Sequence, residues 1–119
     1  DQAQTLAVVA LFADAPVRIS NVGNLRIKET DRLSAMRAEL TKLGAYVEEG
    51  EDELTVHPLD AAPSAPVALD TYGDHRMAMA LAVAGARLPN VIIKDPSCVV
   101  KTYPRFFEDF LGLLAGRLA

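Results

Sequence analysis

Basic side chains gather at three points of the sequence where a helix is predicted to begin. Unpaired N–H groups give a helix start a partial positive charge, so each cation placed there costs about 0.3–1 kcal/mol. A bound anion reverses that cost, because helix N–H groups and Arg or Lys side chains both bind phosphate and carboxylate. The pattern therefore indicates a site for anionic ligands. The residues are Lys28 and Arg32 at the helix start near residue 30, His75 and Arg76 at the one near residue 77, and Lys101 before the one that follows Pro104.

The segment KETDR, residues 28–32, adds two carboxylates to the first of these helix starts. A carboxylate in this position usually caps the helix or interacts with its dipole. Glu29 becomes a candidate acid or base only where its pKa is raised and a substrate proton lies within reach. A plainer alternative is a surface cluster in which Arg32 and Lys28 pair with Asp31 and Glu29, worth little in stability. Spacing alone does not decide between the two.

The other basic residues have plain alternatives as well. His75 and Arg76 precede an apolar helix, and charged pairs commonly mark the point where such a helix leaves the core. Lys101 could be one of the many lysines that are simply solvated. Cys98 follows a predicted strand in an apolar stretch, so we interpret it as a packing residue.

Several kinds of site are excluded by residue count and spacing. One cysteine and two distant histidines do not make a zinc site. The segments GNLR and YGDHR match neither the P-loop nor the dinucleotide-binding fingerprint. Nucleotide binding by those two routes is therefore unsupported.

Composition narrows the class of protein further. The 119 residues suit one domain or a large piece of one, and half of them are hydrophobic, enough for a core. A net charge of −4 argues against a nucleic-acid partner. We expect no membrane span and no signal peptide. The single cysteine allows no internal disulfide and fits a reducing compartment, so we expect a cytoplasmic protein.

The periodicity of apolar residues predicts the elements that must position these side chains. The predicted order is α-β-α-β-β-α-β-α, an α/β or α+β layered domain. The chain has no initial Met and its helical pattern begins at once, so we expect a fragment of a longer protein. Helices are predicted over 2–13, 30–43, 77–84 and after Pro104, strands over 17–21 and 90–95, a hairpin over 45–57, and a loop over 58–68.

Three of these helices carry informative local signals. In the first, Leu6, Val9 and Ala10 recur at helical spacing, which predicts its apolar face. Gly44 is a suitable end for the second. The third contains MAMALAVA at 77–84, which has no polar face and is therefore expected to be buried on every side, with Asp74 as its cap.

Three longer segments occur in order along nearly the whole chain: NLRIKETDRLSAMRAELTKLGAYVEEG, TYGDHRMAMALAVAG and DPSCVVKTYPRFF. Together they resemble the C-terminal part of the EPSP synthase family, the 5-enolpyruvylshikimate-3-phosphate synthases. The combination of KETDR, DHRMAM and KTYP is specific. The resemblance implies repeated β/α units in two lobes, with buried parallel helices whose N-termini point into the cleft between them. This chain, residues 1–119, would then be an incomplete section of one lobe that lacks the N-terminal lobe as its partner.

The resemblance also implies a reaction: transfer of the carboxyvinyl group of phosphoenolpyruvate to a hydroxyl of shikimate 3-phosphate, with loss of phosphate. It implies no metal and no organic cofactor. Two alternatives stay open, a related transferase with another acceptor such as a UDP-sugar, and a non-catalytic anion-binding module. We expect the chain alone to be inactive. The implied residues are Asp1 as base for the hydroxyl, Glu29 for the methylene proton, His75 as a further catalytic group, Asn24 and Lys28 on shikimate 3-phosphate, Arg32 and Arg76 on the carboxylate of phosphoenolpyruvate, and Lys101 on its phosphate.

Overall fold

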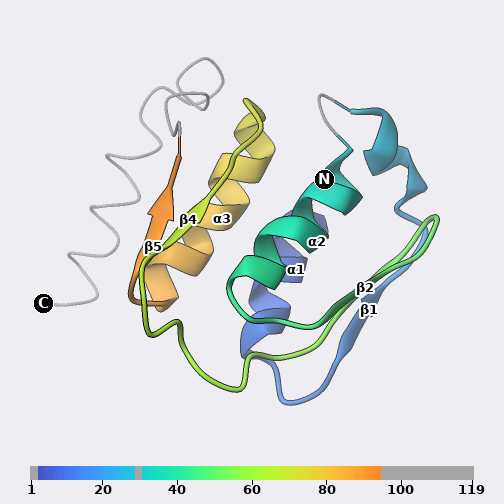
Figure 1. Cartoon of the computed structure of the whole chain (residues 1–119). Helices are drawn as coiled ribbons and strands as arrows, with labels where there is room; N and C mark the ends of the chain where they lie inside the picture. The colour runs from blue at the N-terminus through green and yellow to red at the C-terminus, as the bar shows by residue number, and fades with distance from the viewer. Residues whose placement is uncertain (1–2, 29–30, 95–119) are drawn as a thin grey trace, which may run out of the picture.

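The computed structural model describes residues 3–28 and 31–94, which form a mixed helix and strand domain (Figure 1). Two short 3-10 helices supplement the α-helices in this part of the chain. The α-helices are α1 (Ala3–Val9), α2 (Arg32–Lys42) and α3 (His75–Arg87), and the 3-10 helices are η1 (Ala10–Phe12) and η2 (Gly23–Ile27). The strands are β1 (Val17–Ile19), β2 (Val47–Glu49), β3 (Leu54–Val56), β4 (Val67–Leu69) and β5 (Val91–Ile93).

The described strands form two sheets. One has the order β1-β3-β2 and is antiparallel, with Val56 of β3 opposite both Val17 and Val47. The other pairs β4 with β5 in parallel, and Val67 lies opposite Val91. Because parallel neighbours need a crossover connection, α3 lies between β4 and β5 in the chain.

The described α-helices lie between the two sheets, as Figure 1 shows. Helix α2 packs on β2, α3 packs on β5, and α1 packs on α3. All three helices run in the same direction, so their N-terminal ends lie on one side of the molecule (Figure 1). The core between the layers is built from buried aliphatic side chains, the largest being Leu11, Leu33, Met36, Leu40, Leu69, Met77 and Leu81.

Local capping explains where α2 and α3 begin. The Asp31 side chain accepts a hydrogen bond from the Ser34 backbone N–H at 3.2 Å, and Asp74 accepts one from the Arg76 N–H at 2.9 Å. Such caps satisfy backbone donors that have no partner within the helix. At the other end of α2, Gly44 takes a φ of 103°, the left-handed conformation that ends many helices. The predicted caps Asp74 and Gly44 are confirmed.

Burial of the first and third helices differs from the prediction in part. In α3 most of the apolar run is buried, but Met79 and Val83 are half-buried, so the helix is not enclosed on every side. The predicted apolar face of the first helix is confirmed for Ala10, which is buried, and wrong for Leu6 and Val9, which are about half exposed because α1 packs on another side. That side carries Gln4, Ala7 and Val8, all buried.

The predicted loop over 58–68 is also wrong at its end, where Val67 and Ala68 belong to β4. This strand is three residues long and is stabilised by parallel pairing with β5, a partner distant in sequence. The remaining predicted elements up to β5 are confirmed, and the 3-10 helix η2 lies between β1 and α2, where no element was predicted. The predicted helix after Pro104, and Cys98, lie outside the described residues. Within residues 3–28 and 31–94, no helix combines the length and apolar character needed to cross a bilayer.

Candidate functional site

The starts of α2 and α3 are joined by a buried ion pair. Arg32 Nε donates to Asp74 Oδ2 at 2.7 Å, and Arg32 Nη2 donates to Asp74 Oδ1 at 3.1 Å. The side chains are 6% and 0% exposed. Asp74 thus holds Arg32 while it caps α3 through the Arg76 N–H. Bidentate Arg–carboxylate pairs are geometrically specific, so this contact fixes the two helix starts relative to each other.

A second arginine, Arg26, joins η2 to the same end of α2. Its Nη1 donates to Asp31 Oδ2 at 2.9 Å, and its Nη2 lies 2.9 Å from Glu49 Oε2. The hydrogen bond to Glu49, followed by that to Asp31, raises the pKa of Arg26. Burial alone would raise the pKa of Asp31, but hydrogen bonds from the Ser34 N–H and from Arg26 outweigh it and lower that pKa. The surface cluster considered above is therefore wrong for Arg32, since Asp31 pairs with Arg26 and Arg32 with Asp74.

The structure brings three predicted site residues together at the two helix starts. Arg32 is buried, His75 is half-buried and Arg76 is exposed. Asn24 lies in η2, which contacts α2, and Lys28 follows directly after it; both are exposed. This end of the molecule therefore presents cations at the positions where the sequence predicted an anion site. The predicted residues Asp1, Glu29 and Lys101 lie outside the described part of the chain.

A second contact, between α2 and the segment before α3, was not predicted from the sequence. Glu39 is fully buried, and its Oε2 accepts a hydrogen bond from the Tyr72 hydroxyl at 2.6 Å. Its Oε1 accepts from the Asp70 backbone N–H at 2.7 Å and from Lys42 Nζ at 2.8 Å. Burial, and then the hydrogen bond to Glu39, raises the pKa of Tyr72 strongly. The sequence carries little signal for this contact, because Glu39 and Lys42 have the spacing of an ordinary surface pair.

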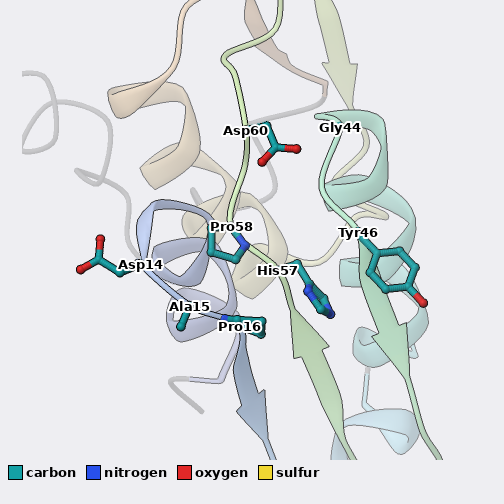
Figure 2. Close-up of a pocket in the computed structure, with 8 residues that line it drawn as sticks. All are labelled: Asp14, Ala15, Pro16, Gly44, Tyr46, His57, Pro58 and Asp60. Carbon is teal, nitrogen blue, oxygen red and sulfur yellow. The ribbon is translucent and has the colours of Figure 1, made fainter.

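A hollow of about 460 Å³ lies at the opposite end of the helices (Figure 2). The Tyr46 and His57 rings lie side by side in it, with centroids 4.8 Å apart. His57 Nε2 is 3.4 Å from Glu48 Oε1. The lining of the hollow has two carboxylates and neither lysine nor arginine, so the hollow is poorly suited to an anion. The lining residues are Asp14, Ala15, Pro16, Gly44, Tyr46, His57, Pro58 and Asp60.

Over residues 3–28 and 31–94, no three His, Cys, Asp or Glu side chains are grouped so that they could hold a metal ion.

Comparisons with known proteins relate the chain to one family. The family model of EPSP synthase (3-phosphoshikimate 1-carboxyvinyltransferase) matches residues 1–110. The chain is 48% identical over 114 residues to a 3-phosphoshikimate 1-carboxyvinyltransferase of Nostoc punctiforme, covering 96% of this chain and 26% of the relative. It is 54% identical over 110 residues to the enzyme of that name from Cellvibrio japonicus, covering 92% of this chain and 26% of the relative.

A solved structure shows the same arrangement of elements. EPSP synthase from Acinetobacter baumannii superposes with a TM-score of 0.79 and 25% sequence identity, over 98% of this chain and 26% of that one. The chain therefore spans about a quarter of the length of these relatives. Its fold is that of one section of an enolpyruvyl transferase. With a family match over 110 of its 119 residues, the chain belongs to the EPSP synthase family.

Proposed function

We propose that this chain is the C-terminal section of an enzyme that transfers the carboxyvinyl group of phosphoenolpyruvate to shikimate 3-phosphate and releases phosphate. The observation that carries the proposal is the meeting of two helix starts at Arg32 and Asp74, with Arg76 in the first turn of α3. Family membership supplies the reaction class. The missing N-terminal lobe is the partner that would close the site, and a cytoplasmic location belongs to the same proposal.

The guanidinium of Arg32 suits it to bind the carboxylate of phosphoenolpyruvate. A guanidinium has five N–H donors in a planar fork, and Asp74 uses two of them. The opposite edge can face a second carboxylate at the same time. Arg76 extends from the neighbouring helix start and is exposed, so a carboxylate between the two would meet cations from both sides. Lys101 would meet the phosphate of the same substrate.

The proton transfers are assigned to carboxylates and follow the family resemblance. The acceptor hydroxyl oxygen bonds to C2 of phosphoenolpyruvate, its proton passes to Asp1, and Glu29 gives a proton to the methylene carbon. The tetrahedral intermediate then breaks its C2–O bond to phosphate, which takes the proton from Asp1. Glu29 removes a proton from the new methyl group and restores the vinyl group. His75 lies half-buried beside Arg76, where it would contact the same substrates.

The acceptor is assigned to shikimate 3-phosphate through Asn24 and Lys28. Both are exposed in and directly after η2, so they are open to a ligand approaching the start of α2. A UDP-sugar acceptor is the alternative within enolpyruvyl transfer. Competition between the two acceptors, measured in a complete enzyme, separates them: the proposal requires that shikimate 3-phosphate is consumed and that a UDP-sugar neither reacts nor competes.

A chimaeric enzyme tests the reaction directly. In it, this chain replaces the matching section of the Cellvibrio japonicus relative, and this hybrid enzyme is called the chimaera below. Glu29→Gln is expected to lower turnover about 100-fold or more, because general acid–base groups contribute on the order of 10²–10⁴. Binding of phosphoenolpyruvate should stay within about three-fold, since Gln keeps the size of the side chain. The matched control is Glu51→Gln, an exposed carboxylate between β2 and β3, which should leave turnover unchanged.

Full turnover by Glu29→Gln would contradict the assignment of the proton transfers. A chimaera that binds phosphoenolpyruvate but never releases phosphate would support the anion-binding module instead. The 119-residue chain assayed alone is expected to release no phosphate, because the other lobe is needed to close the site. Saturable phosphate release by the isolated chain would overturn that expectation.

A further inference from the structure

Helix α2 is tied to the segment that leads into α3 at two separate points. The first is the Arg32–Asp74 ion pair at the start of the helix. The second is Glu39, which binds the Asp70 N–H and the Tyr72 hydroxyl. Arg32 and Glu39 lie two turns apart on α2, about 10 Å along its axis and on the same face. Residues 70–74, called the 70–74 loop below, therefore run alongside α2 and are held at both ends.

The two contacts have opposite polarity. At the start of α2 the helix supplies the cation, Arg32, and the loop supplies the carboxylate of Asp74. Two turns later the helix supplies the carboxylate of Glu39 and the loop supplies two donors. Both carboxylates are fully buried, so leaving either without its donors would cost far more than at the surface. A shift of the loop along α2 in either direction breaks both contacts at once.

The backbone of the loop needs such anchors. Tyr72 and Gly73 both take left-handed conformations, with φ of 58° and 66°. For Tyr72 this conformation is unfavourable, since its Cβ crowds the backbone. Local hydrogen bonds oppose that cost, from the Tyr72 N–H to Asp70 Oδ1 at 2.9 Å and from the Asp74 N–H to the Thr71 carbonyl at 2.9 Å. The turn ends directly at Asp74, so its placement sets where α3 begins.

We propose that Glu39 and Tyr72 are positioning residues for the phosphoenolpyruvate site. They fix the 70–74 loop on α2, the loop fixes Asp74, and Asp74 orients the guanidinium of Arg32 and the first turn of α3. This inference rests on the proposed function. The inference deepens the proposed function because it assigns the two substrates to separately held groups of residues. Arg32 and Arg76, which would bind phosphoenolpyruvate, lie on the side of the 70–74 loop. The acceptor contacts Asn24 and Lys28 lie on the η2 side, which Arg26 holds independently.

The test is Tyr72→Phe in the chimaera, which removes one hydroxyl and keeps the ring. Loss of a hydrogen bond to a buried carboxylate is expected to raise the KM for phosphoenolpyruvate about five- to ten-fold. The KM for shikimate 3-phosphate and kcat should stay within about two-fold, because the η2 contacts do not depend on the loop. The matched control is Tyr46→Phe, an exposed tyrosine at the opposite end of the helices, which should change none of the three.

A second variant and a second readout keep the outcomes distinct. Glu39→Gln should shift the same KM further and speed amide hydrogen exchange at Asp70 and Arg76. Equal changes in both KM values, or an unchanged KM for phosphoenolpyruvate in a folded Tyr72→Phe enzyme, would overturn the inference. Loss of folding in Tyr72→Phe would overturn it too, since the role is local. If the parent chimaera does not turn over, that result contradicts the proposed function and not the positioning role. The positioning role is then tested without activity, by amide hydrogen exchange and by titration of phosphoenolpyruvate into the parent and the two variants.

Discussion

The two ends of the helix layer differ in how their polar groups are held. At the helix-start end, Asp74 is fully buried and accepts hydrogen bonds from three donors, and Glu39, two turns further along α2, is fully buried and also accepts from three. At the opposite end, Asp14 and Asp60 lie around an open hollow, and His57 has one carboxylate at 3.4 Å (Figure 2). The hollow offers a ligand a concave surface. The helix-start end is where charge is organised.

The contrast separates two features that can mark a ligand site: a hollow, and charged groups that buried partners hold in place. Under the proposed function the other lobe closes the site, so organised charge is the feature to expect in this section of the enzyme. Preorganised charge requires partners that hold it, and those partners are buried. The hollow has volume but no such support.

The largest expected effect concerns the Arg32–Asp74 pair, compared with an exposed ion pair. Asp74→Asn keeps the shape of the side chain but leaves the Arg32 charge without its counter-ion. This should lower the free energy of unfolding by about 3–5 kcal/mol, the range for breaking a buried pair from one side. Urea unfolding of the chimaera measures it.

The control for that variant is Glu53→Gln, which removes the partner of the exposed Arg18. Exposed pairs contribute about 0–1 kcal/mol, so the loss should be small. If the two variants cost the same, the Arg32–Asp74 contact does not hold the helix starts in the way the structure indicates.

A pair of glycines, one at each end, gives the next largest effect. Gly73 and Gly44 both have positive φ, 66° and 103°, and an added Cβ would meet no atom closer than 4.0 Å. Replacing either by Ala should therefore cost about 1 kcal/mol of stability through the backbone alone. Only Gly73→Ala should also raise the KM for phosphoenolpyruvate, because it lies in the 70–74 loop. An equal rise in the KM for phosphoenolpyruvate in Gly44→Ala would contradict the proposal that only the helix-start end supports this substrate.

The smallest expected effect is a pH dependence that arises in the 70–74 loop. Burial and the hydrogen bond to Glu39 raise the pKa of Tyr72 above its ordinary value of 10.0. A raised pKa in the folded state stabilises the fold at pH below about 10 and loses that contribution as the pH rises through the folded value. Unfolding measured from about pH 8 to 11 should show a steeper alkaline loss of stability in the parent chimaera than in Tyr72→Phe. Tyr46→Phe should keep the slope of the parent, and an equal flattening in both variants would exclude Tyr72 as its source.

Much of the fold could be predicted because its signals are local. Asp74 and Gly44 are caps that act within a turn of their own helix, and the β2–β3 hairpin closes over a short turn. Strand β4 was missed because its three residues carry no pattern of their own and depend on β5. The face of α1 was mispredicted because packing on α3, and not the spacing of Leu6 and Val9, decides which side is buried.

Some features of the candidate site could likewise be predicted from local sequence, and others could not. Basic residues at helix starts are visible in the sequence, so the nearness of Arg32 and Arg76 could be predicted from the pattern. The pairing of Arg32 with Asp74 spans 42 positions, and local spacing carries no information about it. Glu39 is buried only because the 70–74 loop covers it, which again depends on the three-dimensional arrangement. The contacts that support the site are thus the part that sequence reasoning could not supply.

A comparison of the two ends of helix α3 in the chimaera decides whether the helix starts bind phosphoenolpyruvate. Arg76→Gln removes a cation at its start, and Arg87→Gln removes one near its end, where Arg87 lies 4.7 Å from the centre of the Phe12 ring. The measurement is the Kd of phosphoenolpyruvate by titration calorimetry. We predict a rise of about 10- to 100-fold for Arg76→Gln, as expected for a lost charged hydrogen bond, and no change for Arg87→Gln. Equal affinity in Arg76→Gln and the parent would contradict the claim that the helix starts bind this substrate.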